Sequence, residues 1–266
     1  MKRRSFVKAS LLSSSLSVII PVSARSAAAG TGKKSSRQYY ELRVYSFKNE
    51  AQQKLTEAYF ENAAIPALNR MGSKNIGVFT ELKTDVQTKL YVVIPYESIE
   101  AFLRAEEKLS TDPVYAAAGA AYINAPATEP AYDRIESSLL YAFAKMPVIA
   151  VPDKKPRIFE LRRYESASEA AGKKKIEMFN DAGEIAIFKR VGLGPVLFGE
   201  TIIGAMRPNL TYLLAYDDMA AHDQHWKLFG SDPQWKQIKA IPEYADGKIV
   251  SRITAVFLLP AAYSQL

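Results

Sequence analysis

Polar and apolar side chains alternate between residues 39 and 45, with Glu41 and Arg43 on one side and Leu42 and Val44 on the other. A period of two is that of a β-strand, whose successive side chains point to opposite faces. Apolar runs at 76–82, 90–96 and 135–143 predict three further strands. Apolar residues spaced three or four apart predict one helix before the middle strand pair, ending near Gly72, and a second helix after it.

The same succession of patterns occurs a second time along the chain. Tyr40-Glu41-Leu42-Arg43 matches Phe159-Glu160-Leu161-Arg162, 119 positions later, and Asp112-Pro113 matches Asp232-Pro233, 120 positions later. Landmarks that keep their spacing over such a distance indicate two homologous domains rather than an array of short units.

Each half therefore has the order β-α-β-β-α-β, which is the ferredoxin-like arrangement. A four-stranded antiparallel sheet with both helices on one face leaves its other face uncovered. Two such sheets can cover each other, so we expect an α+β fold in which two tandem ferredoxin-like domains pack face to face as a fused α+β barrel. The predicted divisions are a leader at 1–29, a flexible segment at 30–37, domains at 38–146 and 157–262, and a linker at 147–156.

The first residues resemble a twin-arginine export signal. The segment Met1–Lys8 holds paired arginines, a phenylalanine two positions on and a closing lysine. Ala9–Ile20 is too short and too polar to span a bilayer, and the small residues of Ser23–Ala29 supply cleavage points. We expect a periplasmic or secreted protein without a stable membrane anchor after cleavage. The alternative is a basic N-terminus with no targeting role.

Charge and cysteine content exclude several classes of function. The chain carries a formal charge of +7, but the leader holds five basic residues and no acid, which leaves +2 for the remainder. Such a balance argues against nucleic acid as a partner. With 0 cysteines, the chain has no disulfide, no thiolate metal site, no cysteine nucleophile and no lipid-modified cysteine.

Three short motifs resemble those of the NIPSNAP family, within the dimeric α+β barrel superfamily. They are the Tyr-Glu-Leu-Arg-x-Tyr strand at 40–45 and its match at 159–164, the Tyr-Glu/Asp turn after the third strand, and the Asp-Pro-x-Tyr/Trp turn at 112–115 and 232–235. The resemblance extends from Gln38 to Leu259 and implies the barrel fold. The family typically has an arginine-rich second helix, whereas this chain has only Arg104 there in its first half and none in its second.

Six residues of the two repeated strands are the candidate ligand-binding set: Glu41, Arg43, Tyr45, Glu160, Arg162 and Tyr164. Because the leucine and valine between them suit the face under the helices, we expect the six to project into the shared barrel interior. Buried charges persist only when paired, so each arginine should pair with a glutamate, within its strand or crosswise. One interpretation is purely structural, with ion pairs that fix the docking of the sheets. The other is a cavity for an acidic or oxygenated molecule, with the two arginines as carboxylate clamps.

His222 and His225 are the 2 histidines of the chain and stand three apart on one predicted helix. Without cysteine or a third histidine, they are weak candidates for a metal or haem site. The alternative is a solvated helix face, and we predict no cofactor.

Three hypotheses for function follow. The favoured one is an exported module that binds a small molecule or a partner protein, including a second copy of itself. The second is a cofactor-independent monooxygenase or lyase that acts in the barrel interior, and the third is a haem or metal binder. No nucleophile elbow, zinc motif or phosphate-binding loop favours another class of enzyme.

Overall fold

The computed structural model describes residues 36–83 and 89–266. The predicted export leader at 1–29 lies outside the described residues. Within these stretches, no helix has both the length and the apolar character needed to cross a membrane.

The first repeat begins with a strand and a long helical run. Its strands are β1 (Tyr39–Ser46), β2 (Gly77–Glu81), β3 (Lys89–Tyr96) and β4 (Arg134–Ala142). Its helices are α1 (Glu50–Tyr59), the π-helical segment η1 (Phe60–Ala64), α2 (Ile65–Arg70), α3 (Ile99–Leu103), α4 (Ala105–Ser110), α5 (Pro113–Ala118) and α6 (Ala120–Ile123). The helical run continues from Glu50 to Arg70, and the π-helical segment ends two residues before Pro66, whose ring and missing backbone N–H disturb the regular helical hydrogen bonds.

The second repeat follows the same order. Its strands are β5 (Ile158–Glu165), β6 (Pro195–Ile203), β7 (Asn209–Tyr216) and β8 (Arg252–Pro260). Its helices are α7 (Glu169–Asn180), α8 (Glu184–Val191), α9 (Met219–Ser231), α10 (Pro233–Lys239), the 3-10 turn η2 (Pro242–Tyr244) and α11 (Asp246–Ile249). Gly183, with φ of 96°, separates α7 from α8 in the left-handed region that favours glycine.

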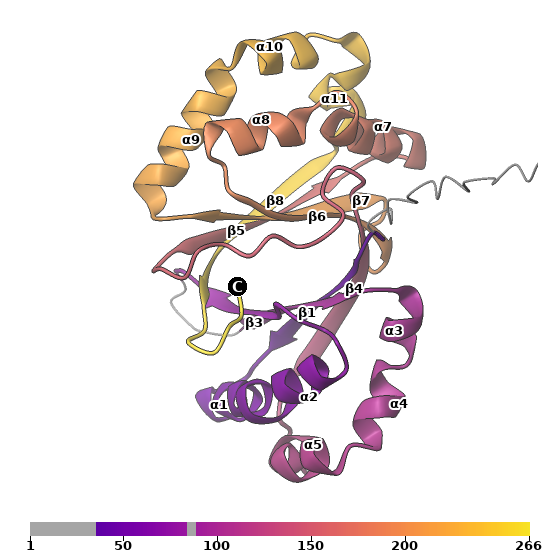
Figure 1. Ribbon diagram of the computed structural model, residues 1–266, viewed down its shortest axis with the longest axis vertical. Coiled ribbons are helices and arrows are strands. Elements are labelled where there is room, and N and C mark those ends of the chain that lie inside the picture. The colour runs from indigo at the N-terminus through magenta and orange to yellow at the C-terminus, as the bar shows by residue number, and fades with distance from the viewer. Residues whose placement is uncertain (1–35, 84–88) are drawn as a thin grey trace, which may run out of the picture. The chain divides into compact units, whose positions relative to one another are not determined.

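The strands form one closed antiparallel barrel in the order β1-β3-β2-β8-β5-β7-β6-β4. Within a repeat the outer strands flank the central pair, and the two repeats join where β2 pairs with β8 and β4 with β6. Figure 1 shows the helices of the two repeats on opposite outer sides of the strands. Closure leaves no sheet edge unpaired, and the predicted fused α+β barrel is confirmed.

Apolar side chains fill the interior of the barrel. Tyr40 and Leu42 from the first repeat meet Phe159 and Leu161 from the second, and all four are buried. The same cluster includes Phe79, Tyr91, Val93, Leu140, Leu197, Leu213 and Leu258.

The predicted assignment of strand faces is therefore wrong. Glu41, Arg43 and Tyr45 lie on the outer face of the barrel, under the helices of the first repeat, and Glu160, Arg162 and Tyr164 do the same in the second. The physical reason is that both faces of these sheets are covered. The lumen-facing side is mostly apolar, with Glu81 hydrogen-bonded to Tyr91 among its few charged groups, whereas the layer under the helices opens to solvent at its rim and holds both ion pairs.

Candidate functional site

A cavity of about 570 Å³ lies between the first-repeat sheet and helices α3 to α6. Strand β1 supplies Glu41, Arg43 and Tyr45 to its floor. The other lining residues are Tyr59, Tyr96, Phe102, Leu103, Ala105, Glu106, Leu109, Ser110, Tyr115, Tyr122, Ile123 and Ile135. We call this space the first-repeat cavity. It brings together three of the six residues proposed from the sequence.

An ion pair forms its floor. Arg43 donates from Nε to Glu41 Oε1 at 2.6 Å and from Nη2 to Glu41 Oε2 at 2.9 Å. The same carboxylate accepts hydrogen bonds from the hydroxyls of Tyr96, at 3.2 Å, and Ser137, at 2.9 Å. This confirms the expected pairing within the strand, and it leaves Glu41 with its acceptor sites occupied.

Arg43 keeps donor capacity towards the cavity. Its Nη1 group makes no hydrogen bond to any of the described residues, and the side chain is 27% exposed. Burial by itself would lower the pKa of this guanidinium, but the hydrogen bond and the charge of Glu41 outweigh burial and raise it. Arg43 therefore stays protonated and presents N–H groups to whatever occupies the cavity.

Tyrosines form much of the wall. The rings of Tyr59 and Tyr122 stack with centroids 3.8 Å apart, and the hydroxyls of Tyr59 and Tyr115 are 2.8 Å apart. Tyr122 donates to the Tyr45 hydroxyl at 3.4 Å. Burial is the main cause that raises the pKa of Tyr59, Tyr96 and Tyr122 above its ordinary value. These hydroxyls are therefore neutral around pH 7 and can both donate and accept.

The second repeat holds the same glutamate–arginine–tyrosine triad, Glu160, Arg162 and Tyr164, and a tryptophan lies over its ion pair. Arg162 donates from Nη1 to Glu160 Oε1 at 2.6 Å, and the Tyr216 hydroxyl donates to Oε2 of that glutamate at 3.1 Å. The indole of Trp226 lies over the pair: its Nε1 donates to Glu160 at 3.3 Å, and its ring centroid is 4.8 Å from the Arg162 guanidinium carbon. Trp226 covers the Glu160–Arg162 pair where the first repeat leaves its pair open.

The two histidines occupy separate surroundings on α9. His222 is 2.8 Å from Asp223 through Nδ1 and 3.5 Å from Glu160 through Nε2. His225 lies against Gly192 at the end of α8. The described part of the chain contains no group of three or more potential ligands that could hold a metal ion. The pair therefore carries no metal proposal, and His222 belongs to the packing around the second triad.

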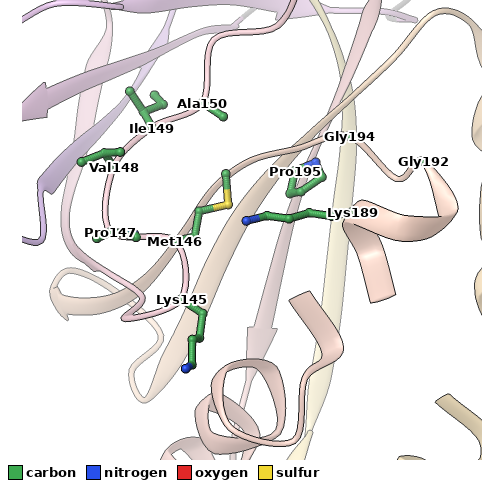
Figure 2. A pocket seen from close by; sticks show the side chains of 10 residues that line it. All are labelled: Lys145, Met146, Pro147, Val148, Ile149, Ala150, Lys189, Gly192, Gly194 and Pro195. Carbon is green, nitrogen blue, oxygen red and sulfur yellow. The ribbon is translucent and has the colours of Figure 1, made fainter. Parts of the chain in front are cut away.

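A second hollow, of about 450 Å³, lies between the inter-repeat linker and the end of α8. Figure 2 shows residues 145–150, which run from the end of the first repeat into the linker, on one side of it and Lys189 on the other, with Gly192 and Gly194 nearby. Apart from lysine side chains and backbone, its lining is apolar. It lacks the converging polar groups that line the first-repeat cavity.

Sequence reasoning missed the tyrosine wall and the role of Trp226. Tyr115 is the aromatic residue of the Asp-Pro-x-aromatic motif, and Tyr122 stands seven positions further along, at helical spacing. Position 106 is glutamate, whereas the position 120 residues later is Trp226. Aligning the two repeats at this position would have shown, from the sequence alone, that they differ there.

Two solved structures share this architecture. Both bear the name "putative monooxygenase": the protein from Lactobacillus acidophilus, with TM-score 0.58 and 11% identity over 85% of this chain and 94% of that one, and the protein from Fusobacterium nucleatum, with TM-score 0.54 and 12% identity over 85% and 93%. A NIPSNAP-like domain protein from Burkholderia xenovorans is 21% identical over 41% of this chain and 88% of its own, with TM-score 0.36. At these identities the first two show a shared fold alone. No curated protein matches the chain.

The family assignment comes from the sequence itself. The family model described as NIPSNAP matches twice, over residues 40–147 and 159–265, and these two segments cover most of the chain. Each match begins in the first strand of a repeat and includes its Asp-Pro-x-aromatic turn. The chain belongs to the NIPSNAP family and contains two copies of the family domain.

Proposed function

We propose that the protein binds a small, uncharged, oxygen-bearing molecule in the first-repeat cavity. The observation that carries the proposal is the difference between the repeats. The first leaves a cavity of about 570 Å³ above its ion pair, while the second covers its pair with Trp226. The space is open to solvent beside Leu103 and Ile123, so a small molecule can reach it.

The charges of the site favour an uncharged ligand over a carboxylate. Arg43 already makes two hydrogen bonds to Glu41, so a second carboxylate would have to compete with a bidentate partner. Glu106 adds another acidic group to the lining. A carbonyl, ether or hydroxyl oxygen can accept from the free Nη1 group without displacing Glu41. The initial hypothesis of arginines as carboxylate clamps is modified accordingly.

The wall favours a flat ligand. The partly exposed rings of Phe102, Tyr115 and Tyr122 add aromatic surface to the wall, and the hydrogen-bonded hydroxyls of Tyr59 and Tyr115 keep acceptor capacity at its edge. Tyrosine suits such mixed contacts because one end of the side chain is apolar and the other polar. We therefore infer an aromatic or otherwise planar compound with at least one oxygen acceptor.

The test introduces a tryptophan into the first repeat at the position that matches Trp226. Glu106→Trp should place an indole over Arg43, as Trp226 lies over Arg162, and so exclude the ligand. Glu107→Trp is the matched control, because Glu107 is exposed and does not line the cavity. We would purify each protein from the cell envelope of its native host and identify bound molecules by native mass spectrometry. A molecule retained in the control and absent from Glu106→Trp supports the proposal; one retained in both would contradict it.

A cofactor-independent oxygenase or lyase acting in the same cavity is the second candidate. The barrel interior proposed for this activity is filled with apolar side chains, so the reaction would move to the first-repeat cavity. The Arg43 N–H groups and the tyrosine hydroxyls are donors that could stabilise an enolate or phenolate oxygen. A turnover screen of phenolic and enolisable compounds, with oxygen uptake and product mass as readouts, tests this activity. Binding without turnover would leave only the first proposal.

We also propose export by the twin-arginine route to the periplasm or beyond, supported by the arginine pair and the short apolar segment of the leader. N-terminal sequencing of protein from the cell envelope should give a start within or just after residues 23–29. An intact N-terminus on soluble protein in the cytoplasm would contradict this. Binding of a partner protein, or assembly with a second copy, stays a prediction.

A further inference from the structure

Exposed apolar side chains gather at the mouth of the first-repeat cavity. Leu103 and Ile123 line the cavity and are nevertheless 69% and 44% exposed. Val114, on the neighbouring helix α5, is 63% exposed. Single exposed apolar residues are normal on protein surfaces, but a group around one opening indicates a contact surface.

The second repeat has polar residues in the matching places. The distance from Tyr96 to Asp112 equals the distance from Tyr216 to Asp232, so the two helical layers can be compared position by position. Leu103 then matches Asp223, and Val114 matches Gln234. The same fold therefore does not need apolar residues at these positions. They occur in the repeat that has an open cavity and are missing from the repeat whose triad is covered.

The floor and the mouth of the cavity thus differ in chemistry. Arg43 and the tyrosine hydroxyls provide polarity at the bottom, whereas Leu103 and Ile123 are lining residues that are exposed to solvent and apolar. A compact polar ligand would use only the floor. A ligand with an apolar extension would also cover the two exposed side chains at the mouth.

We propose that the natural ligand is amphipathic, with an oxygenated head on Arg43 and an alkyl or prenyl tail that leaves the cavity across Leu103 and Ile123. This inference rests on the proposed binding function and narrows its ligand class. Each tail methylene that the mouth covers should tighten binding about two- to fourfold, since burial of apolar area is the driving force. The gain should end once the tail extends past Ile123 into solvent.

The test uses a homologous series of neutral probes, the 4-hydroxyphenyl alkyl ketones with tails from methyl to octyl. Affinities would be measured by calorimetry for the wild type, for Leu103→Asp combined with Ile123→Ser, and for Leu228→Asp. Leu228 is the matched control because it is an exposed leucine on α9, away from the cavity lining. We expect affinity to rise with tail length in the wild type and the control, and to stay flat in the double variant.

The outcomes separate the two proposals. If the short ketones bind and tail length has no effect in the wild type, the tail inference is overturned while cavity binding stands. If no member of the series binds, both are overturned for this class of ligand. If the double variant keeps the tail dependence but changes the oligomeric state, the apolar mouth is a contact between copies and the tail inference is again overturned. Unchanged thermal unfolding of the double variant ensures that the surface exchange has not altered the fold.

Discussion

The two repeats place the same glutamate–arginine pair under their helices and treat it differently. In the first, Arg43 uses two nitrogen atoms on Glu41 and keeps a third free towards an open cavity. In the second, Arg162 is held between its glutamate and the face of Trp226. The strand motif is thus common to both repeats, while the helical layer decides whether the ion pair is accessible.

Two local changes in the helices produce this difference. The first repeat breaks its second helical segment at Arg104 into α3 and α4, whereas α9 runs without interruption from Met219 to Ser231. The position that faces the pair carries Glu106 in one case and Trp226 in the other. In the second repeat the indole covers the pair, while Arg162 Nε is buried without a hydrogen-bond partner among the described residues. Part of the polar capacity of the first repeat remains available to a ligand.

The two repeats also differ in the polar groups that they bury in their cores. The second repeat buries an ion pair between Lys175 and Glu184, 3.2 Å apart, with the ammonium 4.8 Å from the Phe179 ring centroid. The first repeat has Thr56 at the position matching Lys175, buried and donating to the Ala131 carbonyl at 2.9 Å. A buried ion pair is sensitive to the loss of one partner, whereas a buried hydroxyl costs less to remove.

The largest effect should therefore come from Lys175→Met. It leaves Glu184 buried without a counter-charge, which should lower the free energy of unfolding by about 3–5 kcal/mol at pH 7. Thr56→Val, the matched change in the first repeat, should cost about 1–2 kcal/mol. Urea unfolding of both variants measures the difference. Equal losses would contradict the view that the two cores are held by different interactions.

The dependence on pH sharpens this test. Burial raises the pKa of Glu184 above its usual 4.5, and Lys175 only partly opposes the shift. A carboxyl with a raised folded-state pKa favours the folded state most when protonated, below the unfolded value, and this advantage is lost as the pH rises through the folded value. The deficit of Lys175→Met should thus shrink on acidification towards pH 4.5. The double variant Lys175→Met with Glu184→Met should be near the wild type and insensitive to this change.

A smaller effect is expected from the cover of the second triad. Trp226→Ala removes a partly buried indole that contacts Phe188 and Phe229, at centroid distances of 5.7 Å and 5.6 Å. The expected loss is about 3 kcal/mol, at the low end for aromatic truncations because the ring is partly exposed. Glu106→Ala, the matched change, should stay within about 0.5 kcal/mol of the wild type.

Binding of free indole provides a control for the prediction on Trp226→Ala. If Trp226 closes a site that would otherwise resemble the first-repeat cavity, free indole should bind the Trp226→Ala protein and raise its melting temperature. The wild type should show no such shift at the second repeat. A similar response of Glu106→Ala and Trp226→Ala to indole would indicate that the two sites are equivalent after all.

Much of this architecture follows from periodicity. The alternation at 39–45 and the apolar run at 90–96 correspond closely to β1 (Tyr39–Ser46) and β3 (Lys89–Tyr96). Because the sequence repeats and each predicted sheet has one uncovered face, the two sheets are expected to cover each other, which leads to the closed barrel. The break between α3 and α4 could not be predicted from the sequence, because the interruption at Arg104 involves neither proline nor glycine.

Orientation and accessibility could not be predicted in the same way. Alternation separates Glu41 from Leu42 but cannot tell which face points into the barrel when both faces are covered. The lumen-facing side is mostly apolar, and the paired Glu41 and Arg43 are found on the other side. Whether that side contains a cavity depends on single helix residues such as Glu106 and Trp226, whose effect requires the packed structure.

The smallest expected difference concerns a feature that the repeats share. Asp112 and Asp232 each cap a helix that begins with proline, accepting backbone N–H groups through Oδ1, and each pairs with an arginine, Arg70 or Arg190. The arginine hydrogen bond is the main cause that lowers the pKa of both carboxyls below the usual 3.8. A lowered folded-state pKa contributes stability above the unfolded value, and this contribution is lost as the pH falls through the folded value.

Asparagine at either position keeps the cap and removes only the charge. Both variants should therefore melt slightly below the wild type at pH 7 and converge with it as the pH falls through the lowered pKa of the aspartates, where these are themselves protonated. Asp232→Asn should show the larger effect, because that side chain is 9% exposed whereas Asp112 is 22% exposed, and water weakens ion pairs that it reaches. Thermal unfolding between pH 2.5 and 7 measures both. If a variant still melts below the wild type at low pH, the substitution disturbs the helix cap itself. The difference in melting temperature at pH 7 would then not come from the ion pair.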